Sequence, residues 1–356
     1  MPDDLSMHDL AAVDVAAHEL RVAPQLVRRL RNAFYKQSLP MAHVAVMLDP
    51  PEMARLIPRL RHSFLSLLTR QDSPTDGASK LAFATQDGLT VESVILRIRS
   101  GRASLCVSTQ VGCPLACAFC ATGRSGFTRN LSRDEIIDQV IQANRLLAPE
   151  ARRVRNVVFM GMGEPLLNED SVYAALEVVR SERCLYIPDR YLTVSTAGIP
   201  NALLRLAERY PRVNLALSLH TTNTDIRERL MPVARHHSLS ALRQALLAMA
   251  PLRPGPLLIE YIPFQGLNDS ESDADSLADW LGGIPAHINL IPWNTLPNVA
   301  GLIGAGLESC RQFGLWLKAR GFKVTLRRSL GQDIAAACGQ LAGERSGYPE
   351  KALVNI

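Results

Sequence analysis

The sequence predicts an α/β fold: a partial (βα)6 TIM-like barrel, preceded by a small N-terminal helical domain and a β-extension. Three observations carry this prediction. The first 70 residues have helical periodicity, and from Ser104 onward short apolar segments alternate with helical ones, which is typical of right-handed parallel βαβ units. Polar signatures follow several of the apolar segments. Because the loops after barrel strands carry the chemistry, these signatures predict one site at one end of the barrel.

The N-terminal region is expected to be helical. In Val13–Leu30 and Pro51–Leu68, apolar residues recur at steps of three and four, with arginines between them. This pattern is typical of amphipathic helices. The arginines predict a basic face on a small accessory domain that binds RNA.

A β-hairpin is expected next. Gln71–Gly77 is rich in turn residues, and Lys80–Arg99 alternates around Asp87-Gly88, a dipeptide that favours tight hairpin turns. Three arginines alternate along or just after the second strand: Arg97, Arg99 and Arg102. They could line an RNA groove or form a solvated strand edge that prevents aggregation, and the sequence favours neither.

Seven strands and six helices are expected after Ser104. The strands are Leu105–Gln110, Val154–Met160, Tyr191–Ser195, Val213–Leu219, Leu257–Ile262, His287–Ile291 and Phe322–Leu326. The helices are Ser132–Leu147, Asp170–Arg180, Asn201–Glu208, Leu239–Ala250, Asp273–Leu281 and Leu307–Arg320. We therefore expect a helical domain over 1–72, a linker and hairpin over 73–103, the barrel with a C-terminal cysteine segment over 104–343, and a tail over 344–356.

The loop after the first strand carries three cysteines, at 113, 117 and 120. A cubane iron–sulfur cluster normally takes four thiolates, so three would leave one iron open to a ligand from outside the protein. Phe119 would give this loop an apolar wall that limits access of water. Zinc would need a fourth nearby ligand, and a disulfide framework suits short secreted chains; the sequence favours the cluster over both. The C-x3-C-x2-C spacing resembles the signature of the radical S-adenosylmethionine (SAM) superfamily.

Other strand ends carry Met160–Pro165, Ser195–Gly198, Ser218–Thr221 and Pro292–Asn294. Glycines at 161 and 163 allow close approach of a ligand, and Glu164 could accept hydrogen bonds from an ammonium group or a ribose. Taken singly, each signature is weak, since a lone histidine such as His220 is more often structural. Together they point to one mouth of the barrel. Near the end of the chain, Cys338 stands among small residues; from the residues alone, a small buried hydrophobe is the favoured interpretation.

Composition sets broad limits. Of the 356 residues, 47% are apolar and 21% charged, which is ordinary for a soluble protein. The acidic start does not resemble a signal peptide, and no apolar run is long enough to span a bilayer. With seven cysteines and no export signal, a reducing cytoplasm is expected. The net charge of +5 mildly favours a polyanionic partner, although only five of 39 basic residues are lysine, as in arginine-rich genomes.

Five motifs in order resemble the RlmN/Cfr family of radical SAM RNA (adenine) methyltransferases: Cys106–Cys113, Gly161–Asn168, Ser218–His220, Asn289–Asn294 and Ala336–Gly343. The resemblance runs from about Lys80 to the end, and it is weaker over the first 70 residues. It implies a radical SAM barrel that methylates an adenine ring carbon of 23S rRNA, and in the RlmN branch also of tRNA. It further implies a 4Fe–4S cluster on Cys113, Cys117 and Cys120, and two SAM molecules per turnover.

The resemblance also assigns roles. Cys338 would take a methyl group from one SAM, and the radical from a second SAM would take a hydrogen atom from that methyl. The resulting methylene radical would add to the ring carbon, Glu92 would remove the ring proton, and Cys106 would release the product by forming a disulfide with Cys338. SAM contacts would fall on Gly163, Glu164, Ser195, Ser218, Leu219, His220 and Asn294. Cys184 and Cys310 match no motif.

Some departures leave the ring position open. Gln332 stands where the RlmN branch often has an acidic residue, and one residue is inserted between Glu92 and Cys106. Pro165 and the residues 166–168 favour RlmN, hence carbon 2; carbon 8, as in Cfr, is the alternative. A radical SAM enzyme acting on a peptide or small molecule is a second rival, and an iron–sulfur electron carrier a third. We expect a monomer with no membrane contact, reduced by a flavodoxin or ferredoxin.

Overall fold

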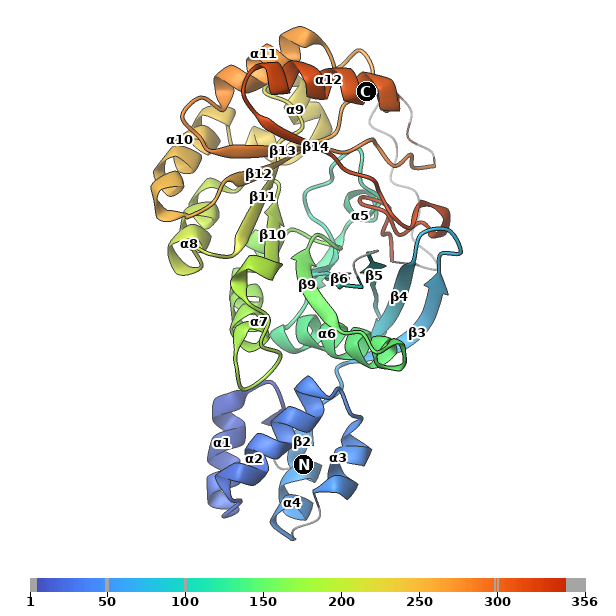
Figure 1. The fold of residues 1–356 in the computed structure, drawn as a ribbon, viewed down its shortest axis with the longest axis vertical. Coiled ribbons are helices and arrows are strands. Elements are labelled where there is room, and N and C mark those ends of the chain that lie inside the picture. The colour runs from blue at the N-terminus through green and yellow to red at the C-terminus, as the bar shows by residue number, and fades with distance from the viewer. Residues whose placement is uncertain (1–4, 49–50, 99–100, 298, 300, 344–356) are drawn as a thin grey trace.

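The computed structural model describes residues 5–48, 51–98, 101–297, 299 and 301–343. In Figure 1 a small helical domain lies below a curved, open barrel, and the helices of the barrel cover its outer side. Among the described residues, no helix is long and apolar enough to cross a membrane. The predicted tail over 344–356 lies outside the described residues.

The N-terminal domain has four short α-helices: α1 (Leu10–Glu19), α2 (Pro24–Arg31), α3 (Met41–Met47) and α4 (Pro51–Leu56). Asp9 caps α1 by accepting a hydrogen bond from the Ala12 amide at 2.9 Å. Pro24 begins α2, where its missing N–H costs nothing. The periodicity over Val13–Leu30 therefore belongs to two helices.

The helix expected over Pro51–Leu68 is wrong in its second half. After α4 the chain forms a 3-10 turn at Ile57–Arg59, then β2 (Leu60–Arg61) and β3 (Leu65–Asp72). Pro58 lies within the turn and cannot donate an α-helical hydrogen bond. Strand β3 pairs with β4 and exposes every residue after Leu65, so burial did not impose the alternation that usually marks a strand.

The predicted hairpin is confirmed. Strands β4 (Ala78–Thr85) and β5 (Thr90–Arg97) pair antiparallel, and Gly88 takes the left-handed conformation at the turn, with φ of 77°. Arg97 binds both carboxylate oxygens of Glu150 at 2.7 Å. Arg99 lies outside the described residues.

One ten-stranded sheet runs through the molecule in the order β14-β13-β12-β11-β10-β9-β6-β5-β4-β3. Seven of these strands are mutually parallel: β6 (Ala103–Cys106), β9 (Val154–Phe159), β10 (Leu192–Thr196), β11 (Asn214–Ser218), β12 (Leu257–Tyr261), β13 (Ala286–Leu290) and β14 (Lys323–Leu326). Strands β3 and β14 are the two edge strands of the sheet, so the barrel is open. This agrees with the partial barrel predicted from the sequence.

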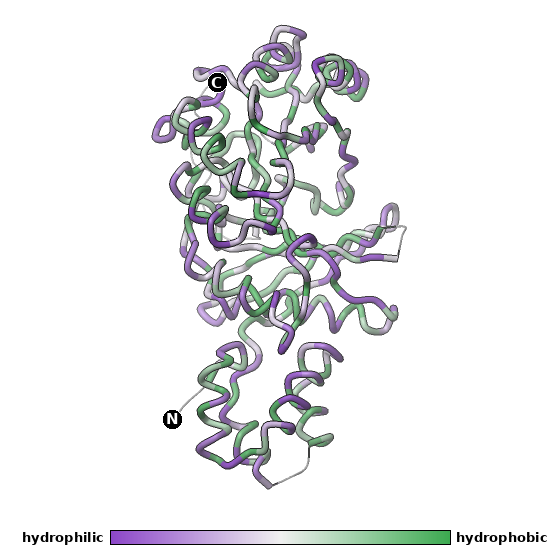
Figure 2. Tube along the Cα trace, turned by 60° about the vertical axis from the view of Figure 1, so that its left-hand side comes forward, coloured by the Kyte–Doolittle hydropathy of each residue, from purple (hydrophilic) through white to green (hydrophobic). Residues whose placement is uncertain are grey.

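Six crossover helices match the prediction: α6 (Arg133–Leu147), α7 (Glu169–Arg180), α8 (Pro200–Arg209), α10 (Leu239–Met249), α11 (Glu271–Trp280) and α12 (Leu307–Ala319). Shorter helices α5 (Ala121–Arg124) and α9 (Thr224–Leu230) lie in loops. In Figure 2 the outer helices alternate hydrophobic and hydrophilic residues, whereas the strands are mostly hydrophobic. Each helix thus packs one face on the sheet.

The first barrel strand differs from its prediction, Leu105–Gln110. Strand β6 ends at Cys106, and a second short strand, β7 (Gln110–Gly112), pairs with β8 (Phe127–Asn130) instead. The break lets Ser108 turn inward, where its backbone N–H and C=O both bind the buried side chain of Gln139. An apolar run alone does not reveal this change of partner.

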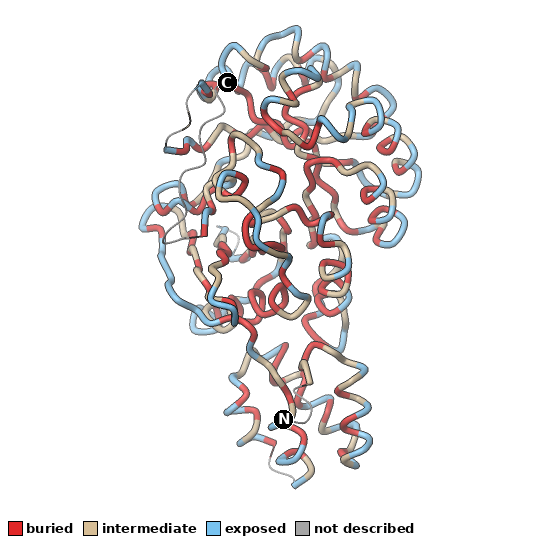
Figure 3. Tube along the Cα trace, turned by 180° about the vertical axis from the view of Figure 1, so that it is seen from behind, coloured by how far each residue is buried: buried red, intermediate tan, exposed pale blue. Residues whose placement is uncertain are grey.

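The helical domain is attached to the barrel through polar contacts that are buried at Asp138 and exposed at Arg183. Asp138 on α6 accepts hydrogen bonds from the Phe64 and Leu65 amides, both at 2.8 Å. Arg183 binds Asp14 at 2.6 Å. Figure 3 shows buried residues continuing from the barrel into the helical domain, and these apolar residues form one cluster with the core of the barrel.

A candidate cysteine-rich active site

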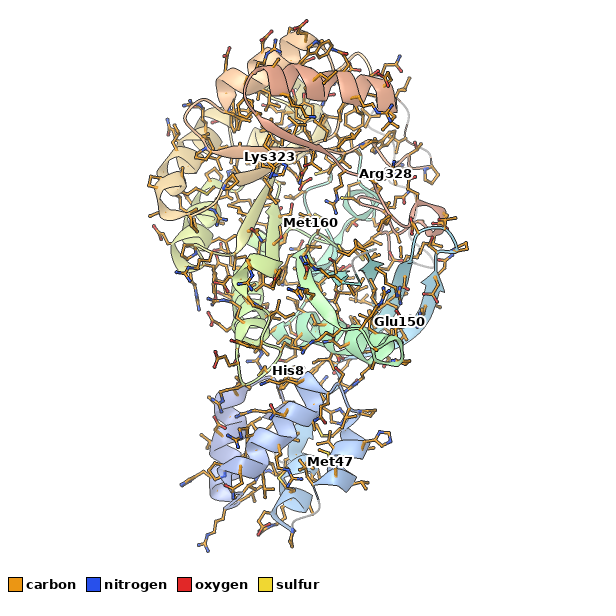
Figure 4. The ribbon with its side chains drawn as sticks, viewed as in Figure 1. His8, Met47, Glu150, Met160, Lys323 and Arg328 are labelled. Carbon is orange, nitrogen blue, oxygen red and sulfur yellow. The ribbon has the colours of Figure 1, made fainter. Side chains whose placement is uncertain are left out.

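One cavity opens at the carboxyl ends of the parallel strands. Most of the predicted site residues line it: Cys106, Cys113, Cys117, Cys120, Gly163, Glu164, Ser195, Ser218, His220, Asn294 and Cys338. Two predicted residues lie outside this lining, Glu92 and Leu219; the Leu219 side chain is fully buried in the core instead. Figure 4 labels Met160, also in the lining, directly after β9.

Backbone contacts fold the cysteine loop, residues 113–120. The Cys113 amide donates to the Gly126 carbonyl at 2.9 Å, and the Ala118 amide donates to Leu230 at 2.9 Å. Gly112 has a φ of 79°, and a Cβ there would lie 1.8 Å from the Gly126 oxygen. Phe119 is buried and packs edge-on against the His220 ring, with centroids 4.7 Å apart. Phe119 therefore gives the cysteine loop the apolar packing surface that we expected from the sequence.

The three thiols interact with one another. Burial, with a smaller contribution from the neighbouring Cys120, raises the pKa of Cys113 to about 12. Burial also raises the pKa of Cys117 well above its usual value, with Cys120 and Cys113 adding to the effect. Among the described residues, no group of three His, Cys, Asp or Glu side chains is arranged to hold a metal ion. The three thiols are nonetheless coupled within one loop, and three thiolates together suit a cluster that spreads positive charge over several irons.

A buried cation lies beside them. Arg227 on α9 is 0% exposed; its Nη2 donates to the Ala197 carbonyl at 2.7 Å, while its Nε and Nη1 have no partner. Burial lowers its pKa to about 10, and Cys117 acts in the opposite direction. A guanidinium with orphan donors next to thiols favours an anionic group in this cavity. The residues present therefore fit a thiolate-bound cluster.

Glycines let the loop after β9 pack closely against the segment that follows β6. A Cβ at Gly161 would lie 2.7 Å from the Val107 oxygen, and one at Gly163 would lie 2.6 Å from the Gln110 Cβ. Glu164 is buried and accepts hydrogen bonds from the Ala197 amide at 2.8 Å and the Leu166 amide at 3.1 Å. Burial raises its pKa to about 7, although these amides lower it. Glu164 is thus a desolvated carboxyl group facing the cavity.

His220 serves the structure of the site. Its Nδ1 accepts a hydrogen bond from the Ile262 amide at 3.1 Å. Burial lowers its pKa to about 3, so the ring is neutral and Nε2 carries the proton. Its φ of 61° turns the chain sharply after β11. His220 lines the cavity and holds the β12 loop at the same time.

The C-terminal segment, residues 331–343, folds back over the mouth. The Asn294 Nδ2 donates to the Cys338 carbonyl at 2.9 Å, and the Ala121 amide donates to the Gly339 carbonyl at 2.7 Å. Thr122 donates to the Leu341 carbonyl at 2.5 Å. Cys338 therefore lies over the cysteine loop although it stands far along the chain, and its side chain is accessible from the cavity.

Cys106 and Cys338 face the same space. Burial, with a smaller contribution from nearby Cys338, raises the pKa of Cys106 to about 12, while Arg327 opposes this shift. Burial also raises the pKa of Cys338, while Arg327 opposes this and Glu260 adds to it. The Arg327 Nη1 lies 4.0 Å from the Glu260 Oε2. The two thiols thus share one guanidinium that can stabilise either thiolate.

Glu92 is engaged by the backbone of the C-terminal segment. Its Oε2 accepts hydrogen bonds from the Ala342 amide at 2.9 Å and the Gly343 amide at 3.0 Å, and its Oε1 lies 3.7 Å from Lys80 Nζ. These contacts hold the segment in place.

Sequence reasoning missed three residues of the cavity region: Arg227, Glu260 and Arg327. Each lies at or just after a strand end, or in the helix that follows. Glu260 gives a signal in retrospect, because a charged residue within the apolar run Leu257–Ile262 is unusual for a buried strand. The arginines give none, since the chain is rich in arginine.

Comparison with known proteins agrees with this geometry. Residues 107–277 match the model of the Radical SAM superfamily. A probable RNA methyltransferase of Rhodopirellula baltica is 42% identical over 340 residues, covering 96% of this chain and 88% of the relative. The dual-specificity RNA methyltransferase RlmN of Ruthia magnifica is 39% identical over 279 residues, covering 78% of each chain.

The fold also matches a solved structure. A radical SAM methyltransferase from Sphaerobacter thermophilus superposes with a TM-score of 0.89 at 34% identity, covering 96% of this chain and 100% of that one. The similarity therefore spans the helical domain as well as the barrel.

Proposed function

This chain belongs to the RlmN family of radical SAM RNA methyltransferases, and we propose that it methylates C2 of an adenine in 23S rRNA and in tRNA. Membership implies a 4Fe–4S cluster and SAM. The relatives' name, dual-specificity RNA methyltransferase, supports two classes of RNA substrate. The residues 165–168, Pro-Leu-Leu-Asn, support carbon 2.

Cys338 is the proposed carrier of the methyl group. The observation that carries this proposal is the position of Cys338: the hydrogen bonds of Asn294 and Ala121 place it in the same cavity as the three cysteines of the loop. Arg327 would stabilise its thiolate, which displaces S-adenosylhomocysteine as the new S–CH3 bond forms.

The cysteine loop is the proposed holder of the cluster, through Cys113, Cys117 and Cys120. With a second SAM bound, the cluster would supply a radical able to take a hydrogen atom. Glu164 would accept hydrogen bonds from the SAM ammonium group, and Gly163, Ser195, Ser218, His220 and Asn294 would line the nucleoside. Leu219 could contribute only backbone atoms, because its side chain is buried in the core. A flavodoxin or ferredoxin is the proposed electron donor.

Cys106 is the proposed resolving thiol. It faces Cys338 across the cavity, so its attack on the Cys338 sulfur would form an S–S bond and release the carbon attached to the RNA. Thiol reductants would then restore both thiols. Glu92 is the residue that the family pattern proposes as base for the ring proton.

Replacing Cys106 tests this assignment. We expect Cys106→Ala to accumulate a covalent protein–RNA adduct through Cys338, because the carbon–sulfur bond can no longer be exchanged. The adduct is measured by denaturing gel and by mass spectrometry after nuclease digestion. Cys184→Ala, a buried thiol outside the cavity, is the matched control. Normal turnover by Cys106→Ala would refute the role, and nucleoside mass spectrometry of the product separates C2 from C8.

A further inference from the structure

A second groove lies at the opposite ends of strands β6, β9 and β10 from the cysteine cavity. Its lining comes from the residues that directly precede these strands or begin them. In Figure 4, the label Glu150 lies just before strand β9, at the end that carries the groove, and the label Met160 lies just after the strand, at the end that carries the cysteine cavity. Five arginines line the groove: Arg102, Arg152, Arg153, Arg155 and Arg190.

The positive charge of this groove is not balanced within it. Among the described residues of its lining, none is Asp or Glu. The two acids adjacent in sequence are engaged elsewhere: Glu150 binds Arg97 with both oxygens at 2.7 Å, and Asp189 binds Arg180 at 2.5 Å. Like charges gathered at one surface repel one another unless an anion joins them. The groove is therefore suited to a polyanion.

Two tyrosines interleave with the arginines. The guanidinium carbons of Arg155 and Arg190 each lie 4.7 Å from the centroid of the Tyr191 ring, and the Arg155 Nη2 donates to the Tyr191 hydroxyl at 2.7 Å. Tyr186 is 55% exposed and has a φ of 54°. Planar guanidinium and phenol groups on one surface are typical of contacts to phosphates and bases of RNA.

We propose that this groove binds the phosphate backbone of the substrate RNA at a distance from the modified adenine. The choice of RNA rests on the proposed function. An acidic electron donor is the competing occupant, but the groove takes the amino end of β9, at Val154 and Arg155, and the cysteine cavity takes its carboxyl end, at Val158 and Phe159, so that about 10 Å of strand separates even the nearest edges of the two. A redox partner would therefore dock far from the cluster ligands, whereas an RNA can extend from one end of the strands to the other.

The test compares RNA affinities without SAM and without turnover. The groove variant is Arg153→Gln/Arg155→Gln/Arg190→Gln. The control is Arg311→Gln/Lys318→Gln/Lys323→Gln, which removes the same charge from exposed positions on α12 and β14. Fluorescence anisotropy measures binding of a labelled tRNA transcript and of a short stem-loop excised from it, over a series of salt concentrations. Unchanged circular dichroism and thermal midpoint verify folding.

We expect the groove variant to bind tRNA about tenfold more weakly or worse than the control, and its log–log salt slope to fall by about 2 to 3. The short stem-loop should lose little affinity. Tyr186→Ala should weaken tRNA binding by about fivefold or more, because the exposed ring offers a stacking surface to a base of the bound RNA. Both effects would support the groove as an RNA site.

Equal affinities of the groove and control variants for tRNA would overturn the inference, while leaving the cysteine chemistry untouched. A loss confined to the rate of cluster reduction by flavodoxin, with RNA affinity intact, would assign the groove to an acidic redox partner and also overturn it. A wild-type protein that binds neither RNA would refute the substrate class itself.

Discussion

At the scale of single residues, burial and hydrogen bonding shift the pKa of the Glu164 carboxyl group in opposite directions. Burial raises its pKa from 4.5 to about 7, against the pull of the amides that it binds. The folded protein therefore holds this proton more tightly than the unfolded chain. The resulting stabilisation is complete below the ordinary pKa and is lost as the pH rises through about 7. At higher pH the ionised group costs about 3 kcal/mol.

Glu164→Gln should remove this cost. In protein freed of cluster and SAM, we expect the variant to raise the free energy of unfolding at pH 8 by about 2 kcal/mol, since one lost hydrogen bond offsets about 1 kcal/mol. Below pH 4 the variant should instead be less stable than wild type by about 1 kcal/mol, because both side chains are then neutral and only the lost hydrogen bond distinguishes them. Denaturant titrations across pH measure the difference. A gap that does not depend on pH would contradict this account.

The chemical role of a residue could be predicted only where a local sequence pattern marks that residue. Cys113, Cys117 and Cys120 have a spacing that specifies their chemistry, and Glu164 stands in a glycine-rich strand end. Arg327 acts through its position beside two thiols, and nothing distinguishes it in the sequence from other arginines. Long-range proximity is a property of the fold and has no local pattern.

At the scale of elements, the C-terminal segment is the part that brings Cys338 to the cavity. It has little regular structure: its only helical turn among the described residues is the 3-10 turn at Gln332–Ile334. Side chains from distant elements hold it instead, through Asn294, Thr122 and Glu92. Its position therefore depends on a few hydrogen bonds.

Two variants of Glu92 separate a holding role from a proton-transfer role. Glu92→Ala leaves the Ala342 and Gly343 amides without their acceptor, so we expect faster hydrogen exchange in residues 336–343 and faster alkylation of Cys338 by iodoacetamide. Glu92→Gln keeps an acceptor and should leave both rates near those of wild type. Mass spectrometry of peptides measures both.

RNA turnover of Glu92→Gln then decides the second role. If Glu92 is the base, this variant should accumulate an RNA adduct even though the segment is held. Full turnover would exclude Glu92 as the base and leave it as a positioning residue. Unchanged exchange and alkylation in Glu92→Ala would contradict the holding role.

Elements were predicted well where periodicity reflected burial. All six crossover helices and six of the seven parallel strands match their predictions closely, because each buries a face on the sheet. Strand β3 failed because its residues after Leu65 are exposed and leave no alternation to detect. The prediction of the first barrel strand was wrong because its apolar run is divided between two sheets: β6 belongs to the ten-stranded sheet, and β7 pairs with β8 in a separate one.

At the scale of the whole molecule, the helical domain and barrel share one apolar core, and Asp138 connects them. It is fully buried, and its Oδ2 accepts the amides of Phe64 and Leu65 at 2.8 Å. A buried amide without a partner costs about 1–3 kcal/mol. The junction is thus sensitive to this one side chain.

We expect Asp138→Ala to lower the free energy of unfolding by about 2–4 kcal/mol, because two buried amides lose their acceptor. Asp138→Asn keeps an oxygen acceptor and should lose clearly less. Urea denaturation monitored by circular dichroism measures both. Equal losses in the two variants would show that packing, not the hydrogen bonds, is what Asp138 contributes.

The central claim is that Cys338 carries a one-carbon unit within reach of the cysteine loop. Its most direct test is to reconstitute the cluster without oxygen, add SAM labelled in its methyl group but no RNA, and locate the label by peptide mass spectrometry. The account predicts one labelled methyl group on Cys338, and none in Cys338→Ala. RNA methylation by Cys338→Ala, or methylation by wild-type protein that never labels Cys338, would contradict it.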